Sequence, residues 1–279
     1  MYKILEKKDL VPTIHLFKIR APSVAKKAQA GQFVVIRIDE KGERIPLTFA
    51  DWNDEEGSVV LVVQEAGATT SRLAQLQAGD SIADFIGPLG VPTHIDNYGT
   101  VICIAGGVGA APIAPIARSL KKAGNRIISI LGARSKALLF WEDRLKNLSD
   151  RLIVTTDDGT YGRKGVVTEP LKELLASGEK IGRVIAIGPA IMMKYCALTT
   201  QPFGVKTIVS LNPIMVDGTG MCGCCRVSVG GVTKFACVDG PDFDGHQVDW
   251  DLLFARQRTY LDEEKTSLKQ WQSACASHT

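Results

Sequence analysis

Three cysteines stand within four positions near the C-terminal end of the sequence, where residues 216–225 read VDGTGMCGCC, and Cys237 follows them. Thiolates bind zinc and iron–sulfur clusters, and both kinds of site use the C-x-x-C spacing of Cys222 and Cys225. The glycines in this stretch allow a tight loop whose N–H groups can bond sulfur. Cys224 is not an expected ligand, because the side chains of neighbouring residues diverge. The segment therefore predicts a site for a metal or a cluster.

Three interpretations of these cysteines stay open on the residues alone. A structural zinc needs a fourth ligand, and the candidates are Asp217 and His246, which stands nine residues past Cys237. An iron–sulfur cluster would use the same thiolates, whereas core cysteines would need no ligand at all. Cys103 and Cys196 are expected to be core thiols of that kind. Disulfides are disfavoured, because the total of seven cysteines is odd and the chain is expected in a reducing compartment.

The composition limits the classes of protein to which this chain can belong. Its 279 residues, 45% hydrophobic and 23% charged, are ordinary for a globular protein with two domains. The formal charge of +3 and the scattered basic residues do not predict nucleic-acid binding. No apolar run approaches the roughly 18 residues that cross a membrane, and the N-terminus has no apolar core of the signal-peptide type. We therefore expect a cytoplasmic protein with neither nucleic acid nor membrane as partner.

Two patterns of secondary structure follow one another along the chain. The first hundred residues hold short apolar runs broken by Gly, Pro and Asp, with a single helical stretch at 70–77, which predicts a small antiparallel barrel. Its strands are expected at 13–19, 31–38, 45–52, 58–66 and 80–90. From Gly99 five apolar runs alternate with helical segments, which predicts a five-stranded, doubly wound parallel sheet. The expected domains are a barrel (1–98), a nucleotide-binding sheet (99–211), the cysteine segment (212–245) and a helical tail (246–279).

Glycine-rich loops follow several strands of the predicted parallel sheet. IAGGVGAAP (104–112) leads from a strand into a helix, where N–H groups and the helix dipole can bind an anion. GARSK (132–136), DDGTYGRKG (157–165) and GPAIMMK (188–194) also stand at the carboxyl ends of strands, where ligands of open α/β sheets collect. Tight turns and plain polar loops would explain each loop singly. Together they favour a nucleotide site, with Arg134 available to a ribose.

The barrel carries two motifs of its own. RIPLT (44–48) stands at the start of a strand, where an arginine and a threonine could bond a phosphate and a flavin ring. GATTSRL (67–73) begins the helical stretch, so that Gly67, Thr69 and Thr70 could bind a pyrophosphate. A surface arginine and a helix N-cap are the alternative interpretations.

A barrel with R-x-P-L-T and G-x-T-T, followed by a sheet with GGVGAAP and GARS, resembles the ferredoxin–NADP reductase superfamily. The resemblance implies FAD on the barrel and a nicotinamide nucleotide on the sheet. The residues that it places against the flavin ring are Arg44, Pro46, Leu47, Thr48, Val62, Val63 and Gln64. Those that it places at the FAD pyrophosphate are Gly67, Thr69 and Thr70. Those that it places around NAD(P) are Gly107, Val108, Gly109, Gly132, Ala133, Arg134, Asp157, Gly188, Pro189 and Met192.

The order of barrel, sheet and cysteine segment resembles the electron-transfer subunit of dihydroorotate dehydrogenase, which carries FAD and a [2Fe–2S] cluster. Cys222, Cys225 and Cys237 match the last three cysteines of its motif, and the first falls on Asp217. An aspartate at that position resembles the small subunit of the electron-bifurcating NADH-dependent ferredoxin:NADP oxidoreductase and the related sulfide dehydrogenase chains. On this resemblance, Asp217, Cys222, Cys225 and Cys237 hold the [2Fe–2S] cluster.

The resemblance also implies how such a chain works. NAD(H), with NADP(H) as the alternative because of Arg134, would exchange a hydride with FAD, and the cluster would relay single electrons. No side chain is expected to act as an acid or a base. A larger subunit with flavin and [4Fe–4S] clusters would complete a heterodimer, and ferredoxin would be reached through it. Dihydroorotate dehydrogenase or a sulfide dehydrogenase is the alternative assembly, and a zinc-stabilised nucleotide-binding scaffold is the alternative of another class.

Overall fold

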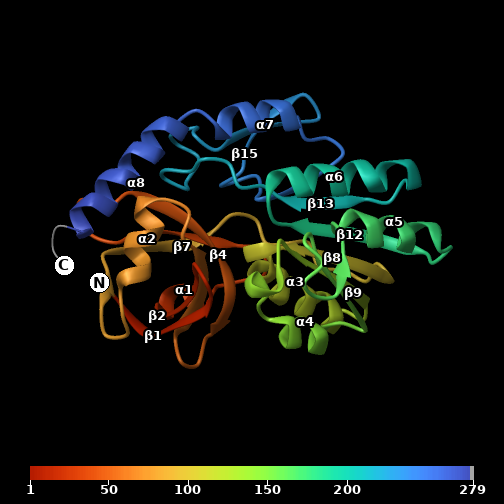
Figure 1. Ribbon diagram of the computed structural model, residues 1–279, viewed down its shortest axis with the longest axis horizontal. Coiled ribbons are helices and arrows are strands. Elements are labelled where there is room, and N and C mark those ends of the chain that lie inside the picture. Colours follow the sequence, from red (N-terminus) through yellow and green to blue (C-terminus); the bar gives the residue numbers. More distant parts are fainter. Residues whose placement is uncertain (277–279) are drawn as a thin grey trace.

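The computed structural model describes residues 1–276. Figure 1 shows two sheets side by side, with the N-terminal barrel on one side, the nucleotide-binding half on the other, and the C-terminal helices running across both. The predicted fold class is confirmed. No helix within residues 1–276 is long and apolar enough to cross a membrane.

The N-terminal sheet has seven antiparallel strands in the order β6-β1-β2-β5-β4-β3-β7. Their bounds are β1 Tyr2–Val11, β2 Ile14–Arg20, β3 Phe33–Arg37, β4 Arg44–Asn53, β5 Ser58–Gln64, β6 Ser81–Ile82 and β7 Asp84–Leu89. Two helices accompany it, α1 (Pro22–Ala25) and α2 (Ala68–Gln75). The prediction of a single helix in this domain is wrong, since α1 forms where Pro22 occupies the first helical turn. Strand β1 was not expected at all.

The second sheet contains the five predicted parallel strands in the order β10-β9-β8-β12-β13. Short strands extend it at both edges, β11 in parallel and β16 antiparallel to β13. The strands are β8 Thr100–Gly106, β9 Arg126–Ala133, β10 Arg151–Thr156, β11 Arg163–Lys164, β12 Ile181–Ile187, β13 Thr207–Ser210 and β16 Asp242–Asp244. The helices are α3 Ala110–Lys122, α4 Glu142–Leu148, α5 Thr168–Ala176 and α6 Ala190–Thr200, with 3-10 turns at Gly107–Gly109, Lys136–Leu138 and Gln201–Phe203.

Alternation along the central strands explains why helices cover both faces of this sheet. In β8, Val101 and Cys103 join the core under α3, whereas Ile102 and Ile104 join the core under α5 and α6. The first of these cores also takes in Ala50 of the barrel. The barrel and the parallel sheet therefore share apolar packing at their junction.

The C-terminal segment returns across the molecule. A hairpin of β14 (Arg226–Val229) and β15 (Val232–Phe235) follows the cysteine loop, and α7 (Trp250–Gln257) and α8 (Leu261–Ala276) follow β16. Asp249 caps α7 by accepting a 3.0 Å hydrogen bond from the Leu252 N–H. Helix α8 reaches the barrel and contacts α2 (Figure 1). Residues 277–279 of the predicted helical tail lie outside the described residues.

Candidate cofactor and cluster sites

An opening between β4 and β5 lies along the residues predicted to hold the flavin ring. The two strands pair from Phe49 with Leu61 onward, to Asn53 with Ser58. Before that point Arg44–Thr48 pairs only with β3, and Val62–Gln64 pairs only with β2. Each stretch therefore has one backbone edge that the sheet leaves free. A flat ring with polar edges fits such a gap, because the free N–H and C=O groups can bond its edge while the strands cover its face.

The N-terminus of α2 lies at the end of this opening. The Thr70 hydroxyl accepts hydrogen bonds from the N–H groups of Ala66 (2.8 Å) and Gly67 (3.0 Å). Thr69 donates to the Glu43 carboxylate at 2.7 Å. Both hydroxyls are thus engaged, but neither threonine is the N-cap: Gly67 is, and Thr70, the third helical residue, bonds back to the Gly67 N–H. The N–H groups of the first turn have no partner within the helix and remain the groups suited to a pyrophosphate.

The glycines of the sheet loops divide into two groups. Gly107 has a φ of +53°, and a Cβ there would meet nothing within 4 Å, so a phosphate can approach this backbone closely. A Cβ on Gly109 would lie 2.1 Å from the Ile187 carbonyl oxygen, and one on Gly188 would lie 3.0 Å from Gly106 Cα. Gly109 therefore allows the start of α3 to pack against β12, and Gly188 allows the loop after β12 to pack against the end of β8. Gly106 is also closely packed, since a Cβ there would lie 2.4 Å from the Met192 sulfur. It was not among the predicted site residues, although the adjacent pair Gly106–Gly107 in the sequence could have indicated it.

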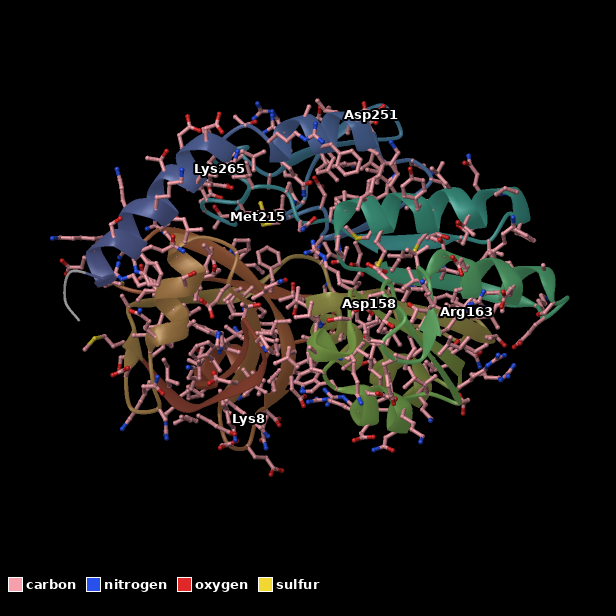
Figure 2. All side chains as sticks on the ribbon, in the orientation of Figure 1. Lys8, Asp158, Arg163, Met215, Asp251 and Lys265 are labelled. Carbon is pink, nitrogen blue, oxygen red and sulfur yellow. The ribbon has the colours of Figure 1, made fainter. Side chains whose placement is uncertain are left out.

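The loops after β9 and β10 are joined by their backbones. Ala133 and Arg134 accept hydrogen bonds through their carbonyl oxygens from the N–H groups of Asp157 (3.1 Å) and Asp158 (3.2 Å). The side chains of Arg134 and Asp157 are both exposed. Asp158 lies on the sheet half of the molecule (Figure 2), where its carboxylate accepts from the Thr160 N–H at 2.9 Å. The two joined loops of the sequence-predicted ribose site thus carry the basic side chain of Arg134 and the acidic side chains of Asp157 and Asp158.

Other predicted residues of the nucleotide site lie around the same end of the sheet. Gly132 is the second-to-last residue of β9, and a Cβ there would lie 2.3 Å from Val167 Cγ1, so this glycine serves packing. Met192 is half-buried at the start of α6, and its sulfur faces Gly106. Val108 is half-buried and Pro189 exposed at the mouth of the same loops. All four therefore border the carboxyl ends of β8, β9 and β12.

The cysteine loop brings two of its predicted ligands into contact. The Sγ atoms of Cys225 and Cys237 lie 3.1 Å apart, and both residues are buried. Burial, followed by the bond with Cys225, raises the pKa of the Cys237 thiol to about 12. Cys222 is exposed, and its thiol bonds that of Cys224, which raises the pKa of Cys224. Within residues 1–276 no three His, Cys, Asp or Glu side chains are grouped as a complete metal set.

Asp217 is oriented by the backbone of the same loop. Its carboxylate accepts hydrogen bonds from the N–H groups of Thr219 (2.8 Å) and Cys222 (2.7 Å). The bond from Thr219, with a further contribution from Cys222, lowers the pKa of Asp217 and so favours the charged form that a metal requires. The loop packs on the barrel, since a Cβ on Gly218 would lie 2.8 Å from both Leu89 and Val35 side chains.

The donor chemistry of the loop fits a thiolate-bound cluster better than a zinc completed by histidine. Three predicted thiol ligands and one carboxylate lie on the short stretch 217–237, which also holds Cys224, and the thiols of Cys225 and Cys237 already touch. His246, the histidine considered for zinc, instead lies 2.8 Å through Nε2 from the Thr200 hydroxyl of α6. Met215, just before the loop, lies beneath the C-terminal helices (Figure 2).

Cys103 and Cys196 are confirmed as core thiols, and we predict that they resist alkylation. Both are fully buried, and burial raises the pKa of each to about 12. Because the thiolate is the reactive form, iodoacetamide should label Cys222 and leave Cys103 and Cys196 unmodified in the folded, cluster-free chain. Peptide mass spectrometry measures this directly. Equal labelling of Cys103 and Cys222 under native conditions would contradict the burial.

Comparison with known proteins agrees with this arrangement. The model of the iron–sulfur cluster binding domain of dihydroorotate dehydrogenase B matches residues 212–249. A dihydroorotate dehydrogenase B (NAD(+)) electron transfer subunit homolog of Thermotoga maritima is 52% identical over 96% of this chain and 95% of that protein. A probable electron transfer subunit of the same enzyme from Methanocaldococcus jannaschii is 34% identical over 88% of this chain and 90% of its own length.

Solved structures extend the comparison to the fold. The structure described as an NADH-dependent reduced ferredoxin-NADP oxidoreductase, studied for flavin-based electron bifurcation, is 51% identical with a TM-score of 0.92, covering 98% of both chains. A ferredoxin NADP+ reductase from Neisseria gonorrhoeae, solved with FAD and NADP, is 21% identical with a TM-score of 0.62, covering 73% of this chain and 90% of that one. The second likeness shows the fold alone. By its identity to relatives along nearly its whole length, the chain belongs to the family of dihydroorotate dehydrogenase B electron-transfer subunits and their homologues.

Proposed function

We propose that this chain is the electron-transfer subunit of an electron-bifurcating NADH-dependent ferredoxin:NADP+ oxidoreductase. The observation that carries the proposal is the likeness to the bifurcating oxidoreductase, at 51% identity over 98% of the chain. The aspartate ahead of the three cysteines supports it, because its carboxylate is held in the loop by two backbone N–H groups.

In this proposal each part of the chain binds a different cofactor. The free edges of β4 and β5 and the first turn of α2 would hold FAD, and the loops after β8, β9 and β12 would hold NAD(H). Asp217, Cys222, Cys225 and Cys237 would hold a [2Fe–2S] cluster. When bound, FAD supplies hydride exchange with NAD(H) and the cluster supplies one-electron transfer. The protein would orient these groups relative to one another.

The domain boundaries predicted from the sequence are part of the proposal with one qualification. Strand β16 (Asp242–Asp244) lies in the predicted cysteine segment but pairs with β13 of the nucleotide-binding sheet. This pairing ties the cluster loop to the sheet, so the segment 212–245 is proposed as a lobe of the sheet domain and not as a unit that folds alone.

A larger partner subunit completes the proposal. The sequence has seven cysteines, of which three are assigned to one cluster and two are buried in the core, so [4Fe–4S] clusters and a ferredoxin site would lie on the partner. The names of the relatives favour a second candidate, an electron-transfer subunit that serves dihydroorotate dehydrogenase. A sulfide dehydrogenase assembly is the third.

Purification of the tagged chain from its native cells, without oxygen, separates these candidates. We expect a stoichiometric larger subunit with flavin and [4Fe–4S] clusters, and a complex that couples NADPH oxidation to the reduction of NAD+ and ferredoxin together. A complex that reduces NAD+ with dihydroorotate and ignores ferredoxin would replace this proposal by the second candidate. A colourless chain of this sequence holding zinc would contradict both.

A further inference from the structure

One carboxylate joins the barrel to two elements of the nucleotide-binding half. Asp51 Oδ1 accepts a 2.8 Å hydrogen bond from Arg118 Nη1, and Asp51 Oδ2 accepts one from Arg144 Nη2. Among the ion pairs of residues 1–276, these two are the ones that cross from the barrel to the sheet domain, and both end on Asp51. The Trp52 N–H also donates to Asp51 Oδ1, at 3.0 Å, which fixes the carboxylate on its own strand.

The surroundings of Asp51 hold the two arginines in place. Arg118 lies 5.3 Å from the ring centre of Trp52, and Arg144 lies 4.2 Å from that of Trp141. Trp141 has a φ of +58°, a strained conformation for a bulky residue, and it directly precedes α4. Burial raises the pKa of Asp51, but the bond from Arg118 and the charges of both arginines outweigh burial and lower it. The carboxylate therefore stays charged between its partners.

Each of the three elements that meet at Asp51 contains or follows residues proposed to bind a cofactor. Strand β4 carries Arg44–Thr48, which end three residues before Asp51, about 10 Å along the strand. Helix α3 begins directly after the Gly107–Gly109 turn and carries Arg118 about two turns later. Helix α4 follows the loop that contains Arg134 and carries Arg144. The flavin strand is thus tied to the two helices that follow these loops of the nucleotide site.

We propose that Asp51 is a positioning residue that sets the nicotinamide site against the flavin site. The inference rests on the proposed function, since it assumes that the two cofactors lie where the sequence motifs put them. Apolar packing between the domains also exists at Ala50, but such packing has no preferred direction. The two charge-assisted hydrogen bonds to Asp51, which come from different helices, do have a preferred direction. A hydride transfer depends steeply on that alignment, since a shift of about 1 Å can cost a hundredfold in rate.

The test compares Asp51→Asn with Asp84→Asn in the full chain loaded with FAD. Asp84 is the matched control, because it pairs with Arg37 inside the barrel and is similarly shielded from solvent. In anaerobic stopped flow with NADH, we expect Asp51→Asn to lower the limiting rate of flavin bleaching by at least about tenfold, with less than about a threefold change in half-saturating NADH. Asp84→Asn should match the unaltered chain.

Hydrogen exchange of the same chains gives a readout that needs no turnover. Peptides from β4 and α3 should exchange faster in Asp51→Asn than in Asp84→Asn, with or without cofactor. An unchanged rate of flavin bleaching in Asp51→Asn overturns the inference. A slower rate with unchanged hydrogen exchange also overturns it, because Asp51 would then affect the reaction without holding the two domains together. If Asp51→Asn fails to fold, Arg118→Gln and Arg144→Gln each remove one arm and carry the same comparison.

The two proposals fail in different ways. If NADH does not bleach the flavin of the unaltered chain, the proposed function falls. The exchange comparison would still decide whether Asp51 holds the barrel to the sheet.

Discussion

Replacing Cys225 with serine is expected to remove the iron–sulfur cluster and to leave FAD in place. Cys225 is buried and touches Cys237 at 3.1 Å between sulfurs, so a cluster that uses both would lose a soft ligand for which a hydroxyl is a poor substitute. Iron content of the anaerobically purified chain should fall to less than about a tenth of the unaltered value, because the remaining donors are two thiolates and one carboxylate.

The control for this prediction is the neighbouring cysteine. Cys224 is only partly buried and its thiol faces Cys222, and we expect Cys224→Ser to retain its iron. Iron is measured colorimetrically and the cluster by its absorption shoulder and electron paramagnetic resonance after reduction. Full iron content in Cys225→Ser, or an equal loss in Cys224→Ser, would contradict the assignment of the ligands.

Replacing Gly109 with alanine is expected to destabilise the chain by about 3 kcal/mol, the upper part of the range for overpacked interiors. The added Cβ would lie 2.1 Å from the Ile187 carbonyl oxygen, which is backbone and cannot turn aside. Because Gly109 has an ordinary φ of −59°, the effect would come from packing and not from backbone strain. The free energy of unfolding from urea titration measures it.

The control variant Gly204→Ala shows the cost of backbone strain without overpacking. Gly204 has a φ of +64°, and a Cβ there would meet nothing within 4 Å. That variant should lose about 1 kcal/mol through its left-handed backbone alone. Substitutions at the surface usually change the free energy of unfolding by less than about 0.5 kcal/mol. A loss of that size in Gly109→Ala would contradict the close packing of Gly109 against the Ile187 carbonyl.

The elements with strong periodicity were predictable from the sequence. The five apolar runs after Gly99 became β8, β9, β10, β12 and β13, because residues buried on both faces leave a near-continuous apolar signal. Strand β1 (Tyr2–Val11) gave no such signal. It includes the charged run Glu6–Asp9, and most of its side chains are partly or fully exposed, so its pairing with β2 and β6 makes it a strand.

The candidate sites were predictable as motifs but not as geometry. Spacing identified Cys222, Cys225 and Cys237, but it could not show that Cys222 is exposed while the other two are buried in contact. The motif at Thr70 gave no sign of whether its hydroxyl would face a ligand or bond back to the start of its own helix, and it bonds back.

The link through Asp51 could not be predicted, because its partners stand 67 and 93 positions away and belong to no motif. Only folding brings these groups together. Ion pairs between domains, such as those of Asp51, can therefore be identified from the structure but not from sequence motifs.

The most direct test of the central claim, that electrons pass from NADH through flavin to an iron–sulfur cluster on this chain, is an anaerobic visible absorption spectrum before and after NADH. We expect flavin bands with a broad iron–sulfur shoulder, and we expect both to bleach when NADH is added. Flavin bands without the shoulder would contradict the cluster assigned to Asp217 and the three cysteines. A colourless chain would contradict the flavoprotein assignment itself.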